Sequence, residues 1–181
     1  NFIGDTGVVS MLMNNPEYPT VGLRAEMDAL PIEEETNLEF KSKNKGVMHA
    51  CSHDGIVATA LGVTKLLYEH KDELKCNVKF IFEPAEEVGR GAKKLIKEKV
   101  LENPTVDKMV IFHYANSAPI GMEIQKGVST ATLGRVSIEI IGKSSHWGEP
   151  EKGINAISVA AKVIDAIDKI NEDLKEKIQF V

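Results

Sequence analysis

The chain has 181 residues, of which 43% are hydrophobic and 27% are charged, and its net charge is -5. This composition is typical of a globular protein and excludes an intrinsically disordered one. Because no block of Lys and Arg stands out and no apolar run approaches roughly 20 residues, we expect neither a nucleic-acid nor a membrane partner. Two cysteines, Cys51 and Cys76, are too few for a disulfide framework, which favours a cytoplasmic location.

The first predicted elements are two strands and a helix. Residues 6–13 (TGVVSMLM) and 20–28 (TVGLRAEMD) are apolar or β-branched runs, and the turn-forming residues 14–19 between them predict a hairpin. Residues 54–70 have apolar side chains at helical spacing, and Asp54 could cap the start of this helix.

The next elements alternate between strand and helix. Residues 77–84 (NVKFIFEP) read as a buried strand that ends at Pro84. Residues 86–101 predict a helix that begins with acidic residues and ends with basic ones, as the helix dipole favours. Residues 106–115 (VDKMVIFHYA) read as a further strand, so this region predicts a βαβ unit and an α/β sheet.

The pattern changes near Gly127. Residues 130–145 alternate in the manner of a strand, and residues 151–174 predict a long amphipathic helix. We therefore predict two domains, an α/β domain over residues 1–126 and a smaller α+β unit over residues 127–181.

Several metal-binding or proton-transferring side chains follow the predicted strands. In a parallel α/β sheet, ligands bind beyond the carboxyl ends of the strands. These positions, together with the loop before the first long helix, supply Asp28, Cys51, His53, Asp54, Glu86, Glu87 and His113. Their shared location predicts that the loops converge on one site.

Cys51 and His53 are two residues apart, so their side chains can point the same way in extended backbone. A thiolate and an imidazole suit zinc, and imidazole also accepts nickel or manganese. The start of a helix should also lower the pKa of the Cys51 thiol. The alternative is that Cys51 is a small buried hydrophobe and His53 a cap or a surface group.

Glu86 and Glu87 are adjacent, so in a loop one could bind a cation while the other takes a proton from water. Alternatively, both are acids at a helix start. His113 comes at the end of a predicted strand and is either a metal ligand or a core residue. Asp28 either orients a ligand or caps a turn.

His146 lies in the loop GKSSHWGEP, either as a functional group or as a surface histidine beside Trp147. His49 is a candidate hydrogen-bond donor within its loop. Residues 88–94 (VGRGAKK) suggest a phosphate loop, but the glycine pattern is incomplete and two acidic residues precede it.

Taken in order, four segments resemble one known family. These are LRAEMDALPIEEETNLEFKSKNKGVMHACSHDG, FIFEPAEEVGRGAKKLI, the His of IFHYA, and GKSSHWGEP with KGINAI. They resemble the two-metal aminoacylase and carboxypeptidase family of amidohydrolases, in the branch of hippurate hydrolase and the indole-acetyl-amino-acid hydrolases.

This resemblance implies a metallopeptidase-type sheet with flanking helices, followed by a lid or dimerisation domain. It makes Cys51, His53, Glu87 and His113 the ligands of two divalent ions (zinc, manganese, nickel or cobalt). It makes Glu86 the general base that acts on the water between the ions, with Asp28 orienting a ligand. His146 would reach the active site of the partner subunit in a homodimer and stabilise the oxyanion.

The chain departs from the family at three places. Ser52 stands where the family usually has glycine, Ile56 replaces a second histidine, and Trp147 and Glu149 replace small residues after the lid histidine. Family members are also much longer, so we expect a fragment that lacks an N-terminal segment and the C-terminal half, including one histidine ligand. Such a fragment should be inactive alone.

The predicted function is metal-dependent hydrolysis of the amide bond of N-acyl amino acids or small peptides, through a metal-bound hydroxide and a glutamate base. One alternative is a catalytically inactive metal-binding or scaffold module of the same fold. A nucleotide-binding α/β domain is the second alternative.

Overall fold

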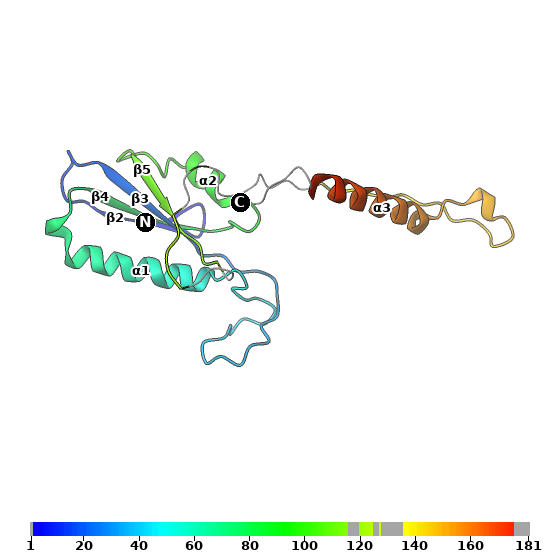
Figure 1. The fold of residues 1–181 in the computed structure, drawn as a ribbon, viewed down its shortest axis with the longest axis horizontal. Coiled ribbons are helices and arrows are strands. Elements are labelled where there is room, and N and C mark those ends of the chain that lie inside the picture. The colour runs from blue at the N-terminus through cyan, green and yellow to red at the C-terminus, as the bar shows by residue number, and fades with distance from the viewer. Residues whose placement is uncertain (1, 116–119, 125–126, 128–135, 176–181) are drawn as a thin grey trace. The chain divides into compact units, whose positions relative to one another are not determined.

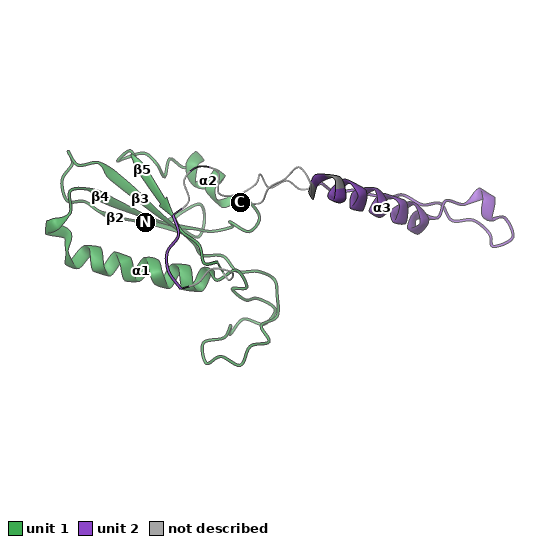
Figure 2. Ribbon diagram, in the orientation of Figure 1, with its two compact units in different colours: residues 1–119 green, residues 120–181 purple. Residues whose placement is uncertain are grey.

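The structure is a computed structural model that describes residues 2–115, 120–124, 127 and 136–175 (Figure 1). It divides into two compact units, residues 1–119 and 120–181 (Figure 2). The predicted domain boundary at Gly127 lies within the second unit. The assignment of the two units as catalytic and lid domains stays a prediction.

The first unit is built on a mixed sheet. Its described strands are β1 (Phe2–Ile3), β2 (Gly7–Leu12), β3 (Thr20–Glu26), β4 (Asn77–Glu83) and β5 (Lys108–Ile111). They lie in the order β1-β2-β4-β3-β5. Strand β3 runs parallel to both β4 and β5, whereas β2 runs antiparallel to β4. The predicted α/β class is confirmed.

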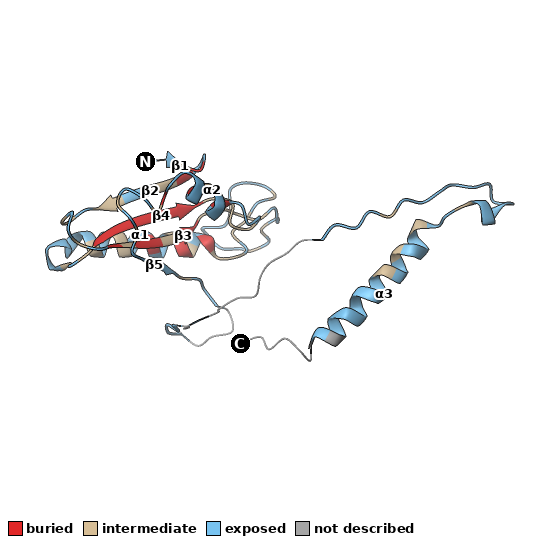
Figure 3. Cartoon of the chain, turned by 90° about the horizontal axis from the view of Figure 1, so that it is seen from above, coloured by how far each residue is buried: buried red, intermediate tan, exposed pale blue. Residues whose placement is uncertain are grey.

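The predicted hairpin between residues 6–13 and 20–28 is wrong, because β4 lies between β2 and β3. All seven residues of β4 are buried, as Figure 3 shows for the centre of the sheet. A strand that is buried on both faces is most stable between two neighbours. The turn at residues 14–19 is long enough to carry the chain past β4.

Helices cover both faces of the sheet. Helix α1 (His53–Glu69) buries Ile56 and Ala60 against Phe80 and other core residues of one face. On the other face, Leu95 of α2 (Gly91–Lys97) packs with Ile81. This division follows from the alternation of side chains along a strand, since Phe80 and Ile81 are neighbours in β4.

Two predicted helix starts need correction. Asp54 does not cap α1, because the helix already begins at His53 and its N-cap residue is Ser52. Ser52 has a φ of 63°, and its side chain makes no capping hydrogen bond. The helix predicted over residues 86–101 begins only at Gly91, since positive φ values at Ala85 and Gly89 interrupt regular helical geometry.

The second unit contains one long described helix, α3 (Ala156–Lys175). The strand predicted over residues 130–145 falls partly outside the described residues. Its described part pairs only through a single bridge between Lys143 and Ile154, so this part of the prediction is wrong. Without a continuous neighbouring strand, the backbone has no ladder to join. Over the described ranges, no helix has the length and apolar character needed to cross a membrane.

Asn77 fastens the connection between β2 and β3 to the start of β4. Its buried side chain accepts hydrogen bonds from the backbone N–H groups of Asn14 (2.8 Å) and Asn15 (3.1 Å). It donates to the carbonyl oxygens of Asn15 (2.8 Å) and Tyr18 (2.9 Å). The Asn77 side chain therefore holds the backbone of the connection in place by hydrogen bonds, although β2 and β3 do not pair with each other.

We expect Asn77→Ala to lower the free energy of unfolding by about 2–4 kcal/mol, because several backbone groups lose their partner. Chemical denaturation measures this change. Asn44→Ala is the matched control, since within the described residues Asn44 makes hydrogen bonds through its backbone but none through its side chain. Equal stability of the two variants would show that Asn77 does not hold this connection.

Candidate metal centre

Four of the predicted site residues, Asp28, Glu86, Glu87 and His113, follow the carboxyl ends of the three parallel strands, and Cys51 and His53 lie at the start of α1. Glu26 of β3 is directly opposite Glu83 of β4, so the loops that carry Asp28, Glu86 and Glu87 leave the sheet side by side. His113 follows the end of β5.

His53 is the most buried member of the site, with 1% of its surface exposed. Its Nδ1 donates to the backbone carbonyl of Asp28 at 2.9 Å, which leaves Nε2 with its lone pair. Nε2 is buried and has no hydrogen-bond partner in the described structure. It lies 3.9 Å from Oε2 of Glu86 and 3.8 Å from Oε1 of Glu87.

A second group of possible ligands shares the same histidine. Sγ of Cys51 lies 3.6 Å from Nε2 of His113, and the rings of His53 and His113 meet edge to face with centroids 5.8 Å apart. Nδ1 of His113 also donates to a backbone carbonyl, that of Tyr114, at 2.8 Å. Both imidazoles therefore present Nε2 toward the same place.

Two sets of three side chains thus converge. Cys51, His53 and His113 form one set, and His53, Glu86 and Glu87 form the other. Within each set the possible ligand atoms lie within 4.8 Å of one another. The structure therefore brings together all four predicted ligands and the predicted base.

The turn after β4 explains how two adjacent glutamates face one histidine. Ala85 has a φ of 56°, which costs an L-residue roughly 1–2 kcal/mol and redirects the chain. The N–H groups of Arg90 and Gly91 bond back to the carbonyl of Ala85. Any Cβ on Gly91 would lie 1.9 Å from the carbonyl oxygen of Pro84, so only glycine fits there. This closed turn keeps both carboxylates outside helix α2.

Asp28 contacts two parts of the site. Its carbonyl oxygen accepts hydrogen bonds from Nδ1 of His53 and, at 3.1 Å, from Nδ1 of His49. Its carboxylate Oδ2 accepts the backbone N–H of Glu87 at 3.1 Å. Among the alternatives for Asp28, the contacts therefore favour orientation of neighbouring groups. His49 is a loop donor, as predicted.

A buried ion network below the site was not predicted from the sequence. Arg24 pairs with Glu26 on its own strand and with Glu83 on β4, the latter at 2.6 Å between Nε and Oε2. The two carboxylate side chains are each 4% exposed and stand directly opposite one another. Arg24 offsets their repulsion and so joins the strand ends that precede Asp28 and Glu86. The signal in the sequence is the presence of charged residues within two largely buried strands, Arg24 and Glu26 in β3 and Glu83 in β4.

The electrostatics around Cys51 differ from the prediction. Burial raises the pKa of the Cys51 thiol, and the carboxylate of Glu87 raises it further. The predicted lowering of this pKa by the helix start is therefore wrong, because burial and the nearby carboxylates both raise it. Burial likewise raises the pKa of Glu86, while the guanidinium of Arg24 opposes that rise.

The donor set fits a divalent cation. Sulfur, imidazole nitrogen and carboxylate oxygen together match zinc and its first-row neighbours. Among the described residues, Nε2 of His53 and Oε1 of Glu87 are buried without hydrogen-bond partners, which is costly unless a cation satisfies both. A cation here would also lower the pKa values of Cys51 and Glu86.

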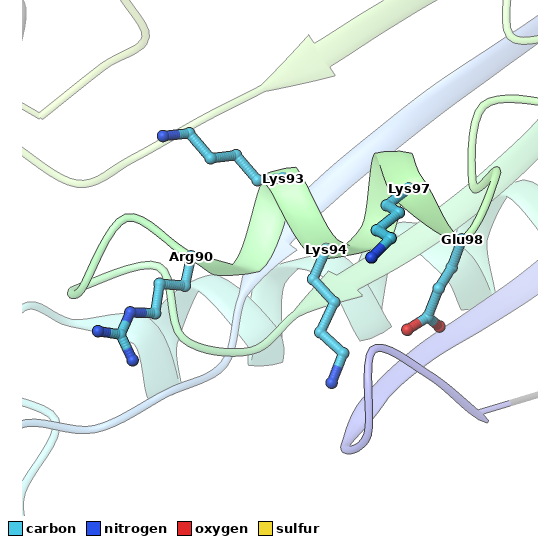
Figure 4. Close-up of a pocket in the computed structure, with 5 residues that line it drawn as sticks. All are labelled: Arg90, Lys93, Lys94, Lys97 and Glu98. Carbon is cyan, nitrogen blue, oxygen red and sulfur yellow. The ribbon is translucent and has the colours of Figure 1, made fainter.

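Two other features are described separately from this centre. His146 belongs to the second unit, where its Nδ1 accepts the N–H of Gly148 at 3.1 Å and its ring packs against Trp147. A surface hollow along α2 is lined by Arg90, Lys93, Lys94, Lys97 and Glu98 (Figure 4). In Figure 4 these side chains spread outward from a short helix, and none is a predicted ligand.

The fold and the site define the first unit as an α/β domain of the metallopeptidase type. The profile of peptidase family M20/M25/M40 matches residues 22–179, so the chain belongs to this family. The family resemblance drawn from the sequence is thereby confirmed.

Named relatives include several enzymes. An N-acetylcysteine deacetylase of Bacillus subtilis is 38% identical over 91% of this chain and 43% of its own length. Thermostable carboxypeptidase 1 of Saccharolobus solfataricus is 42% identical over 90% of this chain and 42% of its own length. The IAA-amino acid hydrolase ILR1-like 5 of Arabidopsis thaliana is 41% identical over 91% of this chain and 37% of its own length. The chain thus spans about two fifths of the length of these relatives.

Solved structures agree with this family. A dinuclear metal-binding M20 peptidase of Bacillus subtilis superposes with a TM-score of 0.60 at 41% identity, over 64% of this chain and 32% of that one. A protein of methicillin-resistant Staphylococcus aureus gives a TM-score of 0.64 at 30% identity, over 97% of this chain and 46% of that one. The predicted metallopeptidase-type sheet is confirmed.

We expect Arg24→Met to lower the free energy of unfolding by roughly 3–5 kcal/mol, because it leaves two buried carboxylates without a cation. Adding Glu83→Gln should recover part of this loss. Urea denaturation measures both effects, and Arg90→Met, on an exposed arginine, is the control. If Arg24→Met cost no more than Arg90→Met, the network would not join the strand ends.

Proposed function

We propose that the protein is a metal-dependent amidohydrolase and that the first unit carries its metal centre. The observation that carries this proposal is Nε2 of His53, which is buried and has no hydrogen-bond partner among the described residues. The thiol of Cys51 and the imidazole of His113 lie near it, and so do the carboxylates of Glu86 and Glu87. Such an arrangement is costly as a purely structural feature and suits a hydrolytic metal site. The family of the chain supports the same conclusion.

We assign Cys51, His53, Glu87 and His113 as ligands of two divalent cations. The metal-binding M20 peptidase of known structure supports the number of ions, and the donors admit zinc, manganese, nickel or cobalt. When bound, the cations would polarise the amide carbonyl and lower the pKa of a water molecule. Asp28 keeps His53 in the tautomer that leaves Nε2 free, through the bond to its carbonyl oxygen.

Glu86 is the proposed general base. Its side chain is 38% exposed, makes no hydrogen bond in the described structure and faces Nε2 of His53, so its Oε2 is open to a water molecule. In this role Oε2 accepts a proton from water and then delivers it to the leaving amine. Glu87 differs because its backbone N–H is held by Asp28 and its Oε1 is buried without a partner.

The proposed substrates are N-acyl amino acids or small peptides. Relatives named as an N-acetylcysteine deacetylase, a carboxypeptidase and an IAA-amino acid hydrolase all act on an amide bond, which supports this class. Homodimerisation through the second unit, with His146 stabilising the oxyanion in the partner's site, rests on the family resemblance alone. The proposed cytoplasmic location rests on the small number of cysteines.

The variant Glu86→Gln tests the role of the base. It should retain the metal content of the full-length protein while kcat falls by about 10²–10⁴, the usual contribution of a general base. The assays are elemental analysis and hydrolysis of a panel of N-acyl amino acids. Glu87→Gln is the matched comparison and should lower the metal content as well.

Two outcomes would contradict this assignment. Normal turnover by Glu86→Gln would remove Glu86 from the role of base, and loss of metal from that variant would make it a ligand. A wild-type protein that binds metal but hydrolyses no member of the panel would instead favour an inactive metal-binding module of the same fold.

A further inference from the structure

His113 reaches the metal centre from the least protected strand of the sheet. All four residues of β5 are exposed, and in the described structure this strand pairs with β3 alone. His113 itself is exposed, yet its Nε2 lies 3.6 Å from Sγ of Cys51. The strand end therefore needs another contact to fix the histidine in place.

Tyr114, the next residue, supplies such a contact to α1. Its hydroxyl forms a hydrogen bond of 2.7 Å with Oγ1 of Thr59 and donates at 3.3 Å to the carbonyl of Gly55. Its carbonyl oxygen in turn accepts Nδ1 of His113 at 2.8 Å. Tyr114 thus links the histidine to the helix turn that follows Cys51 and His53.

Gly55 makes room for this link. A Cβ at Gly55 would lie 2.5 Å from Cε2 of the Tyr114 ring, closer than real Cβ contacts allow. Glycine is a poor residue within a helix, so its presence here agrees with a need for close approach. Gly62, on the same helix, differs because a Cβ there would meet nothing within 4 Å.

We propose that Tyr114 is a positioning residue that holds His113 in the metal centre by packing on Gly55 and bonding to Thr59. This inference rests on the proposed metal-dependent function. Gly55 and Thr59 are four residues apart, so they lie on the same face of α1. The Tyr114 ring packs on Gly55, and the Tyr114 hydroxyl bonds to Thr59. The ring and the hydroxyl therefore act together to set the distance between His113 and Cys51.

The test uses the full-length protein loaded with Co²⁺, whose absorption band from the Cys51 thiolate reports the ion beside this residue. The variants are Gly55→Ala, Tyr114→Ala, their combination, and Gly62→Ala as the matched control. Tyr114→Phe keeps the ring but removes both hydrogen bonds of the hydroxyl, whereas Thr59→Val removes only the bond to Oγ1 of Thr59. Co²⁺ affinity is measured by following the thiolate band in competition with a chelator.

We expect Gly55→Ala to weaken Co²⁺ binding at least tenfold and to shift the thiolate band, while Gly62→Ala leaves both unchanged. Once Tyr114→Ala has removed the ring, adding Gly55→Ala should weaken binding no further. Tyr114→Phe and Thr59→Val should each weaken binding three- to tenfold, and together no more than Tyr114→Phe alone. A loss of helix stability alone would not produce this pattern.

Co²⁺ binding by Gly55→Ala or Tyr114→Phe equal to that of the wild type would overturn the role of Tyr114 and leave the proposed function intact. An equal loss from Gly55→Ala with and without the ring would also overturn it, because the glycine would then act on the helix itself. A wild-type protein that binds no Co²⁺ would overturn both the role of Tyr114 and the proposed function.

Discussion

The buried imidazole of His53 is the feature on which the rest of the site depends. Its Nδ1 is fixed by a backbone carbonyl, and its Nε2 lies between two sets of potential ligands without a partner of its own. A buried nitrogen in this state costs free energy that no other contact in the described structure offsets. A bound cation resolves this cost, and it also brings the two sets into one centre.

The sheet places the other groups around this histidine. Parallel strands β3, β4 and β5 end at the same edge, so the loops that follow them deliver carboxylates and a second imidazole to one place. Arg24 joins two of these strand ends through a buried ion network, and Tyr114 links the third to α1. The precision of the site thus comes from side chains below and beside it.

Local patterns were enough to predict some of this structure. Residues 77–84 read as a buried strand because they form a short run that ends at Pro84, and residues 54–70 read as a helix because apolar residues recur at helical spacing. Both elements form close to the predicted bounds. The pairing of strands was not readable, since nothing in residues 6–28 signals that β4 inserts between them. The late start of α2 was missed because it depends on left-handed backbone at Ala85 as well as at Gly89, and alanine is not a residue type that marks such a turn.

For the site, each residue alone left two interpretations open, and only the order of several segments favoured a metal centre. The sequence could not show that Arg24 pairs across strands or that Tyr114 lies against Gly55, because both contacts require the tertiary fold. The most direct measurement of the central claim is an anomalous-scattering crystal structure of the full-length protein grown with zinc or manganese. The account predicts two peaks among Cys51, His53, Glu87 and His113, at least one of them about 2.0–2.3 Å from Nε2 of His53. Peaks confined to other parts of the protein, or none at all, would contradict it.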